Sequence, residues 1–321
     1  MPIEPATRSS IQRAAKVLAD GGVVAFPTET VYGLGADATN ADAVLRVYEM
    51  KGRPRFNPLI AHVADLETAG AHGCFNASAR KLAEAFWPGP LTIVLKRRAE
   101  SRICDLVSAG LETIALRVPA NEIARGLLRA AGCPVAAPSA NRAGHVSATA
   151  ASHVAADLGE GPDFILDGGD TVLGLESTVI DLSGPEPLLL RPGAIPREEI
   201  ENILAAKLGD ATTPNEPTSP LSPGQLASHY APRARVRLEA TCVEPGEALL
   251  AFGGNPLPTQ GLVVNLSPKG DLREAATRFF AALRQLDDSG CASIAVMPIP
   301  CEGLGEAIND RLRRAAARRG A

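Results

Sequence analysis

The chain has 321 residues, 45% of them hydrophobic and 21% charged, which excludes a wholly disordered protein. A chain of this length is larger than one hydrophobic core usually supports, so we predict two domains. Its 32 basic and 36 acidic residues give a net charge of −4, which excludes a global positive field for nucleic acid, so any polyanion site must be local.

Apolar runs alternate with helical patterns from residue 9 to about residue 193. The first helix is expected to begin with Ser10 as its cap and to carry Ile11, Ala14 and Leu18 on one face. Further helices are predicted at residues 41–50, 77–86, 122–131, 149–158 and 197–208. Short β-branched runs predict strands at residues 23–26, 59–63, 91–95, 113–118, 135–137, 164–166 and 178–182. This alternation is typical of an α/β domain, which we place at residues 1–211.

A change in composition marks a linker at residues 212–232, where prolines at 214, 217, 220, 223 and 232 break any regular element. After it the alternation resumes. Strands are predicted at residues 236–238, 248–252, 262–266 and 294–297, and helices at 272–286 and 304–318. We therefore predict a small Rossmann-like parallel α/β domain at residues 233–321. Its basic end, residues 311–319, is either an RNA-binding helix or, the interpretation that we favour, a solvated face.

No apolar run approaches the roughly 20 residues that a helix needs to cross a membrane, so we expect no membrane partner. Residues 1–5 lack the basic start and apolar stretch of a signal peptide. The six cysteines include no C-x-x-C pair and no short metal-binding spacing. We therefore expect a cytoplasmic protein with reduced thiols and no metal site made by its own side chains.

Two polar segments favour a ligand site. Residues 27–35 follow a strand with two threonines, a tyrosine and two glycines, which favours a ligand-lining turn over a plain one. Lys51, Arg53 and Arg55 lie beside a glycine and two prolines, which prevent a helix there. Clustered cations on a rigid loop suit phosphate, although a solvated basic loop is an equal alternative.

Two single residues stand out within apolar strands. Arg117 interrupts the strand at residues 113–118, and a buried unpaired guanidinium costs several kcal/mol. It therefore needs an anionic partner, either a protein carboxylate, which we favour from the strand alone, or a ligand. His62 lies in the strand at residues 59–63, where a histidine is more often a satisfied core residue than a catalyst. No neighbouring ligand spacing supports zinc there.

Small polar residues also mark the strand ends at residues 137–141, 174–178 and 190–193, and open α/β sheets bind ligands at such ends. Together, these segments resemble the threonylcarbamoyl-AMP synthase family, in its longer form with a YrdC-like catalytic domain and an appended C-terminal domain. The matching stretches are P-T-E-T-V-Y-G-L-G at residues 27–35, K-G-R-P-x-F-N-P-L at 51–59, W-P-G-P-L-T at 87–92, A-P-S-A-N at 137–141, E-S-T-V at 176–179, L-R-P-G at 190–193 and S-P-G-Q-L-x-S-H-Y-A-P at 222–232. The C-terminal part matches only in layout and length.

The resemblance implies a YrdC-like domain with a twisted mixed sheet, followed by the small Rossmann-like domain. It implies an L-threonylcarbamoyladenylate synthase, a nucleotidyltransferase that makes threonylcarbamoyl-AMP and pyrophosphate from L-threonine, bicarbonate and ATP. The product would serve tRNA threonylcarbamoyladenosine modification. The resemblance further implies Mg²⁺ with ATP, no organic cofactor, and a downstream tRNA threonylcarbamoyl-transferase machinery as partner, and it leaves room for a weak RNA contact.

The family's binding residues carry over to matching positions of this chain. The resemblance assigns threonine to Thr30, His62, Arg117, Ala137 and Ser177. It assigns ATP to Lys51, Arg53, Asn57, Thr113, Ser139, Ser147, Arg191 and Tyr230. Residues 222–232 are too proline-rich for a helix and too specific in composition for a mere spacer, so we expect them to fold over the catalytic cleft as a lid.

Three other functions stay open. An RNA-binding module would use the cation loop with Phe56 as a stacking platform, but 4% aromatic residues and an acidic balance argue against it. A carbamoyl-adenylate enzyme of hydrogenase maturation would carry zinc-finger cysteines and an acylphosphatase domain, neither of which the sequence contains. The third alternative is a regulatory protein that binds ATP without chemistry.

Overall fold

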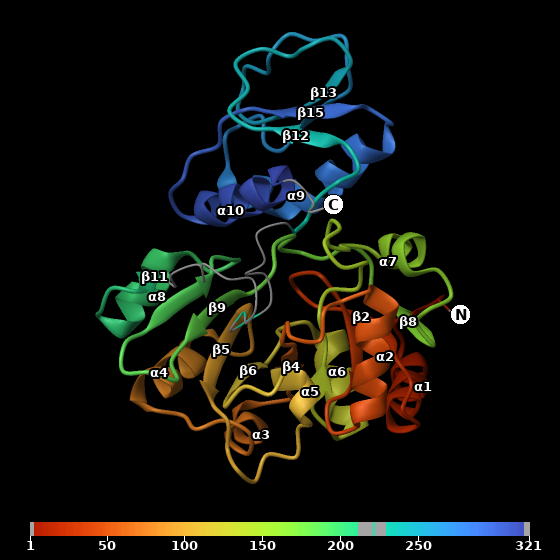
Figure 1. Cartoon of the computed structure of the whole chain (residues 1–321), viewed down its shortest axis with the longest axis vertical. Coiled ribbons are helices and arrows are strands. Elements are labelled where there is room, and N and C mark those ends of the chain that lie inside the picture. The colour runs from red at the N-terminus through yellow and green to blue at the C-terminus, as the bar shows by residue number, and fades with distance from the viewer. Residues whose placement is uncertain (1–2, 211–219, 221, 223–228, 318–321) are drawn as a thin grey trace.

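The computed structural model describes residues 3–210, 220, 222 and 229–317, which form two β-sheets with their helices (Figure 1). The helices are α1 (Arg8–Ala19), α2 (Ala41–Lys51), α3 (Leu66–Gly70), α4 (Ala77–Phe86), α5 (Asp105–Ser108), α6 (Glu122–Ala131), α7 (Ala151–Leu158), α8 (Arg197–Leu204), α9 (Leu272–Asp288) and α10 (Leu304–Ala316). The strands of the first sheet are β1 (Ile3–Pro5), β2 (Val24–Pro27), β3 (Tyr32–Asp37), β4 (Ile60–His62), β5 (Leu91–Lys96), β6 (Thr113–Arg117), β7 (Val135–Ala136), β8 (Phe164–Asp167), β9 (Thr178–Asp181), β10 (Leu188–Arg191) and β11 (Gly209–Asp210). The second sheet contains β12 (Arg235–Arg237), β13 (Glu247–Ala251), β14 (Val263–Asn265) and β15 (Ser293–Val296).

The large sheet is mixed, in the order β1-β8-β2-β3-β7-β4-β6-β5-β9-β10-β11. Strand β4 pairs with β6 in parallel, whereas β5 pairs with β6 antiparallel and with β9 in parallel. This pairing brings the ends of β4, β6 and β9 together, with His62 directly opposite Arg117 in the register. The predicted mixed-sheet α/β fold is confirmed.

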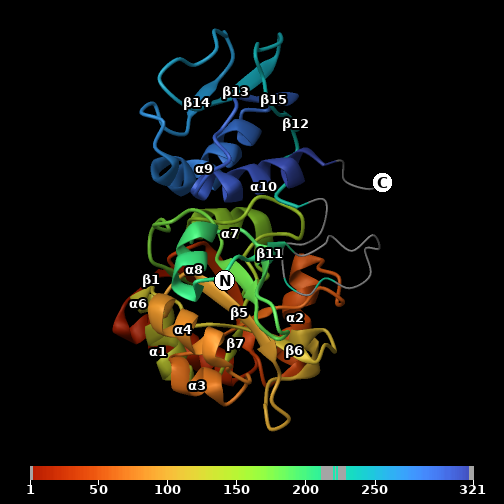
Figure 2. The ribbon, with the colours of Figure 1, turned by 90° about the vertical axis from the view of Figure 1, so that its left-hand side faces the viewer.

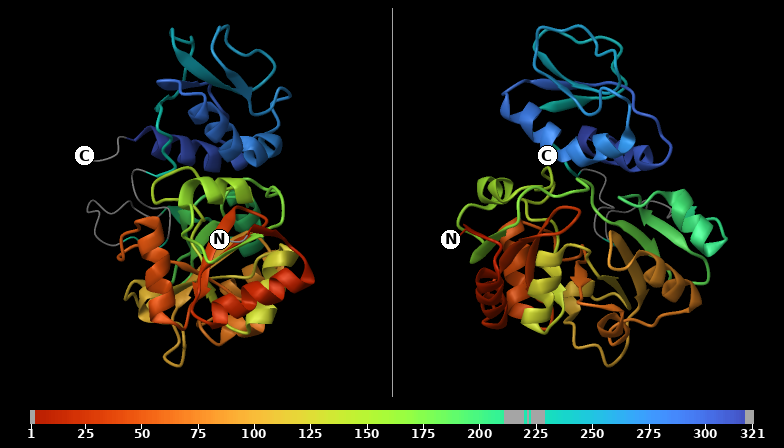
Figure 3. Two further views of the ribbon diagram at one scale, coloured as in Figure 1. Left: turned by 90° about the vertical axis from the view of Figure 1, so that its right-hand side faces the viewer. Right: turned by 180° about the vertical axis from the view of Figure 1, so that it is seen from behind.

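The small sheet is parallel throughout, in the order β12-β15-β13-β14. We call the large sheet with its helices the first unit, and the small sheet with α9 and α10 the second unit. Figures 1 and 2 show α9 and α10 between the small sheet and the first unit, and Figure 3 shows the same arrangement from two further sides. One hydrophobic cluster joins Phe279, Phe280 and Leu312 of these helices to Val31, Leu175 and Tyr230. The second unit therefore shares a core with segments that precede it in the chain.

Most predicted elements are confirmed to within a few residues, but the segment at residues 27–35 is not a turn throughout. Tyr32–Asp37 forms strand β3, antiparallel to β2. A Cβ atom at Gly35 would lie 2.7 Å from atoms of both Phe26 and Val135. This glycine therefore makes room for neighbouring side chains within a sheet, a use that periodicity alone does not distinguish from a turn.

Two helix ends also differ from the prediction. Helix α1 begins at Arg8 with Thr7 as its cap, and Ser10 completes a capping box by accepting from the Thr7 amide at 2.8 Å. Helix α8 ends at Leu204 because Ala205 adopts a left-handed conformation, φ 55°. The chain then pairs β11 with β10 in parallel.

The predicted boundaries at residues 211/212 and 232/233 stay predictions, since of the linker only residues 220, 222 and 229–232 are described. Among the described helices, none combines the length and apolar character needed to cross a membrane.

Candidate functional site

A cavity of about 50 Å³ lies where the polar strand ends of the first unit meet. It is lined by Thr28, Thr30, Val31, Tyr32, Gly33, Arg53, Ile60, His62, Arg117, Ala137, Pro138, Ser139, Glu176, Ser177, Arg191, His229 and Tyr230. All five residues predicted for threonine are among them, and so are Arg53, Ser139, Arg191 and Tyr230 of those predicted for ATP. Segments far apart in the sequence thus converge on one cavity.

The other predicted ATP residues do not line the cavity. Lys51 donates to the Ser139 carbonyl at 2.6 Å, Asn57 accepts from Arg53 at 2.7 Å, and Ser147 donates to Glu176 at 2.7 Å. Thr113 stands at the opposite end of β6 from Arg117, and its partner in the sheet is Lys96. The structure therefore gives Thr113 no contact with the cavity in its present shape.

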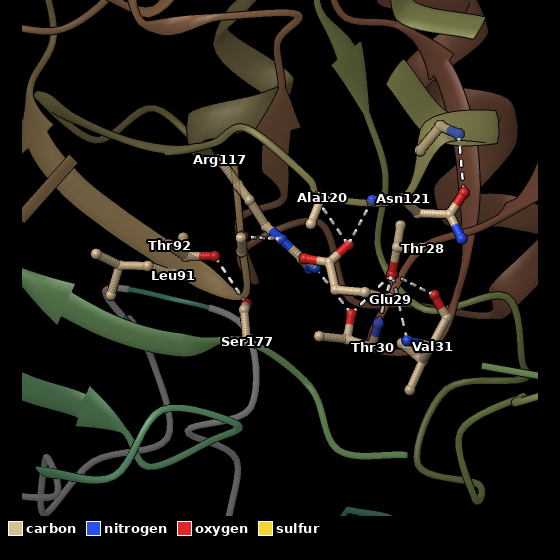
Figure 4. Close-up of polar contacts among 12 residues, drawn as sticks. Thr28, Glu29, Thr30, Val31, Leu91, Thr92, Arg117, Ala120, Asn121 and Ser177 are labelled. Carbon is tan, nitrogen blue, oxygen red and sulfur yellow. Dashed lines mark hydrogen bonds and ion pairs between the residues drawn. The ribbon is translucent and has the colours of Figure 1, made fainter. Parts of the chain in front are cut away.

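Arg117 is paired with a protein carboxylate (Figure 4). Its Nη2 donates to Glu29 Oε1 at 2.7 Å and to Thr30 Oγ1 at 3.0 Å, and both charged side chains are at least nine-tenths buried. Glu29 also accepts from the backbone amides of Ala120 and Asn121. The favoured of the two sequence-based alternatives is confirmed, although the sequence did not identify Glu29 as the partner.

The turn between β2 and β3 is held by hydroxyl groups. Thr28 Oγ1 lies 2.7 Å from Thr30 Oγ1 and donates to the Val31 carbonyl at 2.7 Å. Across the cavity, Thr92 and Ser177 share a hydrogen bond of 2.8 Å (Figure 4). These contacts fix the two side chains, Thr30 and Ser177, that flank Arg117.

Lys51 and Arg53 carry buried positive charge without a carboxylate at ion-pair distance among the described residues. Lys51 Nζ donates to the carbonyls of Ser139 and Asn141, at 2.6 and 2.5 Å. Arg53 donates to Asn57 Oδ1 at 2.7 Å and to the Pro58 carbonyl at 2.8 Å. Burial, reinforced by Arg53, holds the pKa of Lys51 well below its ordinary value, and burial lowers the pKa of Arg53 to about 10. A bound polyanion would relieve both costs.

Arg191 adds a third buried cation to the cavity wall. Its Nη2 donates to the carbonyl and the hydroxyl of Ser177, at 2.8 and 3.0 Å, and burial lowers its pKa. Gly193, just after β10, lets the backbone there pass close to the segment at residues 176–178. A Cβ atom at Gly193 would lie 2.5 Å from backbone atoms of Glu176, Ser177 and Thr178.

We expect Gly193→Ala to lower the free energy of unfolding by about 1–3 kcal/mol, since the added methyl group has no room beside that backbone. Chemical denaturation of the full chain measures this change. Gly184→Ala is the matched control, because a Cβ atom there would meet no atom within 4 Å. Equal stability of the two variants would show that the close approach costs nothing.

Three aromatic or imidazole groups at the cavity have polar atoms that lack a hydrogen-bond partner among the described residues: His62 Nδ1, His229 Nδ1 and Tyr230 OH. Burial, followed by the charge of Arg117, lowers the pKa of His62 to about 3, so its ring is neutral near pH 7. Buried polar atoms are usually satisfied, so these three indicate where a ligand would contribute hydrogen bonds.

The chain is similar to known proteins over both of its units. The Sua5/YciO/YrdC family model, described as "Telomere recombination", matches residues 16–193, and the model "Threonylcarbamoyl-AMP synthase, C-terminal domain" matches residues 195–317. A relative from Bacillus subtilis named threonylcarbamoyl-AMP synthase is 40% identical over 96% of this chain and 93% of its own. One of the same name from Pyrococcus abyssi is 39% identical over 96% and 94%.

A solved structure supports the same relationship. The crystal structure of P. abyssi Sua5 complexed with L-threonine superposes with a TM-score of 0.89 at 37% identity, covering 98% of this chain and 96% of that one. Family models, relatives and structure agree over both units. The chain therefore belongs to the Sua5/YciO/YrdC family, in the form that carries the threonylcarbamoyl-AMP synthase C-terminal domain.

Proposed function

We propose that this protein is an L-threonylcarbamoyladenylate synthase. It combines L-threonine, bicarbonate and ATP into threonylcarbamoyl-AMP and releases pyrophosphate and water. A tRNA threonylcarbamoyl-transferase machinery then consumes this product to modify adenosine in tRNA. Relatives named for this activity over nearly their full length support the assignment.

The observation that carries the proposal is the buried positive charge of Arg53, which lines the cavity, and of Lys51, which holds the carbonyl of the lining residue Ser139. Both side chains are held by neutral acceptors, and both are less than a tenth exposed. A protein tolerates such charges where an anionic ligand supplies the compensating charge. The phosphates of ATP meet that requirement, with Lys51 acting as a point charge and Arg53 as a fork.

We assign L-threonine to the part of the cavity lined by Thr30, His62, Arg117, Ala137 and Ser177. Arg117 uses Nη2 for Glu29 and Thr30, and Nε for the Gly89 carbonyl at 3.4 Å. Its Nη1 makes no hydrogen bond within the described residues, so we assign Nη1 to the threonine carboxylate. The neutral His62 ring then leaves the threonine amine free of a competing charge.

The transfer to phosphorus needs no strong general base, because the group that attacks is already an anion. The threonine amine attacks the carbon of bicarbonate, a C–N bond forms, and water leaves to give an N-carboxylate. One oxygen of this anion attacks the α-phosphorus of ATP, and the bond to the bridging oxygen breaks to release pyrophosphate. Positioning by the hydroxyl groups of Thr30 and Ser177, with charge stabilisation by Arg53 and Arg191, supplies what such a transfer requires.

Mg²⁺ is expected to arrive with ATP. Among the described residues, no group of three or more His, Cys, Asp or Glu side chains could hold a metal ion. The carboxylates of Glu29 and Glu176 are already bound by arginines. The phosphate oxygens of ATP are therefore the ligands that fit, and the ion would neutralise part of their charge. A weak RNA contact and a cytoplasmic location stay predictions.

The test of this proposal is an amino-acid panel with ATP and bicarbonate, in which the adenylate product is identified by mass spectrometry. Threonine should give the product fastest and serine should be the nearest competitor, because one methyl group contributes only about 1–3 kcal/mol of discrimination. Equal rates for threonine, valine and alanine would contradict a threonine site, and the absence of any adenylate would contradict the enzyme activity.

A further inference from the structure

Arg311 is the largest fully buried side chain among the described residues, and it belongs to α10 of the second unit. Its guanidinium group reaches the cavity wall of the first unit. Nε donates to Glu176 Oε2 at 3.1 Å, and Nη1 donates to the Pro192 carbonyl at 2.6 Å. Its central carbon lies 5.4 Å from the centre of the Tyr230 ring. One side chain thus touches three segments that form the cavity.

The contact with Arg311 affects the charge of the cavity because Glu176 is one of its lining residues. Glu176 lines the cavity together with the cations Arg53 and Arg191, where its negative charge opposes an anionic ligand. Arg311 is the cation at ion-pair distance from Glu176 within the described residues. Asp310, the other carboxylate bound by Arg311, also pairs with Arg314 at 3.0 Å. Loss of Arg311 would therefore leave Glu176, and not Asp310, without a cationic partner, although Ser147 would still donate to Glu176.

The ring of Tyr230 depends on the second unit as well. Tyr230 is fully buried with a left-handed backbone, φ 61°, a conformation that costs a non-glycine residue energy. Phe280 of α9 packs 5.5 Å from its ring centre, and Arg311 stacks over the ring. Part of the surroundings that hold this conformation therefore comes from α9 and α10.

We propose that Arg311 is a positioning residue of the ATP site. It neutralises Glu176 so that polyphosphate can enter beside Arg53 and Arg191, and it fixes the ring of Tyr230 at the cavity. The assignment rests on the proposed function, since it takes ATP as the anion. Through Arg311, the second unit then contributes directly to the site and is more than an appended domain.

Arg311→Met keeps most of the side-chain volume and removes the charge. We expect it to raise the dissociation constant for ATP by about tenfold or more, because the buried carboxylate of Glu176 then has no cation beside it and faces the phosphates. The affinity for threonine should change by less than about twofold. Arg311→Met combined with Glu176→Gln removes both charges and should recover most of the ATP affinity.

Two further variants separate this role from simple domain docking. Glu306→Gln weakens another ion pair between the units from the same helix, Glu306 with Arg197 at 2.8 Å, and should leave ATP affinity unchanged. Arg311→Lys keeps the charge but loses the planar fork, so ATP affinity should fall by a smaller factor, about threefold. This variant also provides the test if the methionine variant does not fold.

The experiment is calorimetric titration of the full chain with a non-hydrolysable ATP analogue, and separately with threonine. Weakened analogue binding in Arg311→Met, recovery in the double variant and no loss in Glu306→Gln would support the assignment. Unchanged binding in Arg311→Met, or a double variant no better than the single one, would overturn it. Failure of the wild-type protein to bind the analogue would overturn the proposed function and this assignment together. If the wild-type protein binds the analogue and Arg311→Met binds it equally well, this assignment alone is overturned.

Discussion

Arg53→Ala should raise the ATP concentration needed for half-maximal pyrophosphate release by roughly a hundredfold, since it removes a buried charge that we place against the phosphates. The KM for threonine should stay close to that of the wild type, because none of the hydrogen bonds of Arg53 reaches a residue that we assign to threonine binding. Steady-state kinetics with each substrate varied in turn separates the two effects.

Arg55→Ala is the matched control for that variant. Arg55 belongs to the same loop, but its side chain is 63% exposed and lies 3.8 Å from Glu49, so its removal should leave both KM values unchanged. If Arg53→Ala and Arg55→Ala behaved alike, the loop would be a solvated basic segment with no phosphate role.

Arg117→Ala should lower the free energy of unfolding by about 3–5 kcal/mol, because the buried carboxylate of Glu29 loses its partner. The affinity for threonine should fall by a larger factor than the affinity for ATP. Arg117→Lys should also be harmful, since one ammonium group cannot hold Glu29, Thr30 and a ligand carboxylate with the geometry of the fork. Chemical denaturation and threonine titration measure the two effects separately.

The control for Arg117 is a cation whose carboxylate partner is exposed. Arg125, itself 26% exposed, binds Glu122 at 2.9 Å, and the Glu122 side chain is 76% exposed, so removal of Arg125 leaves no buried carboxylate and Arg125→Ala should cost about 1 kcal/mol or less. A similar small loss for Arg117→Ala would mean that its ion pair with Glu29 contributes little to stability and that the pair can open without penalty.

The sequence motifs predicted the convergence of the cavity well, because each motif of the first unit lies beside the beginning or the end of a strand and these strands belong to one sheet. The partner of Arg117 could not be predicted in the same way. The alternation of the strand shows that the arginine is buried, but the position of Glu29 depends on the turn after β2 and on its capture by the amides of Ala120 and Asn121. Such contacts arise between elements and leave no periodic signal.

The part played by the second unit was missed for a similar reason. Residues 311–319 look like a solvated basic end, and the contacts of Arg311 with Glu176 and Tyr230 arise only when α10 packs on the first unit. Of the predicted lid at residues 222–232, the described residues include His229 and Tyr230, which line the cavity. Residues 221 and 223–228 lie outside the described residues, and the lid stays a prediction.

The reaction that we propose takes the carbon of the product's carbamoyl group from bicarbonate and cleaves ATP only to activate it. Incubation of the enzyme with ATP, threonine and ¹³C-labelled bicarbonate, followed by mass spectrometry of the adenylate, tests this most directly. We expect a threonylcarbamoyl-AMP that carries the label, with pyrophosphate released in equal amount and none released when bicarbonate is rigorously removed. An unlabelled adenylate, or pyrophosphate release at the same rate without bicarbonate, would contradict it.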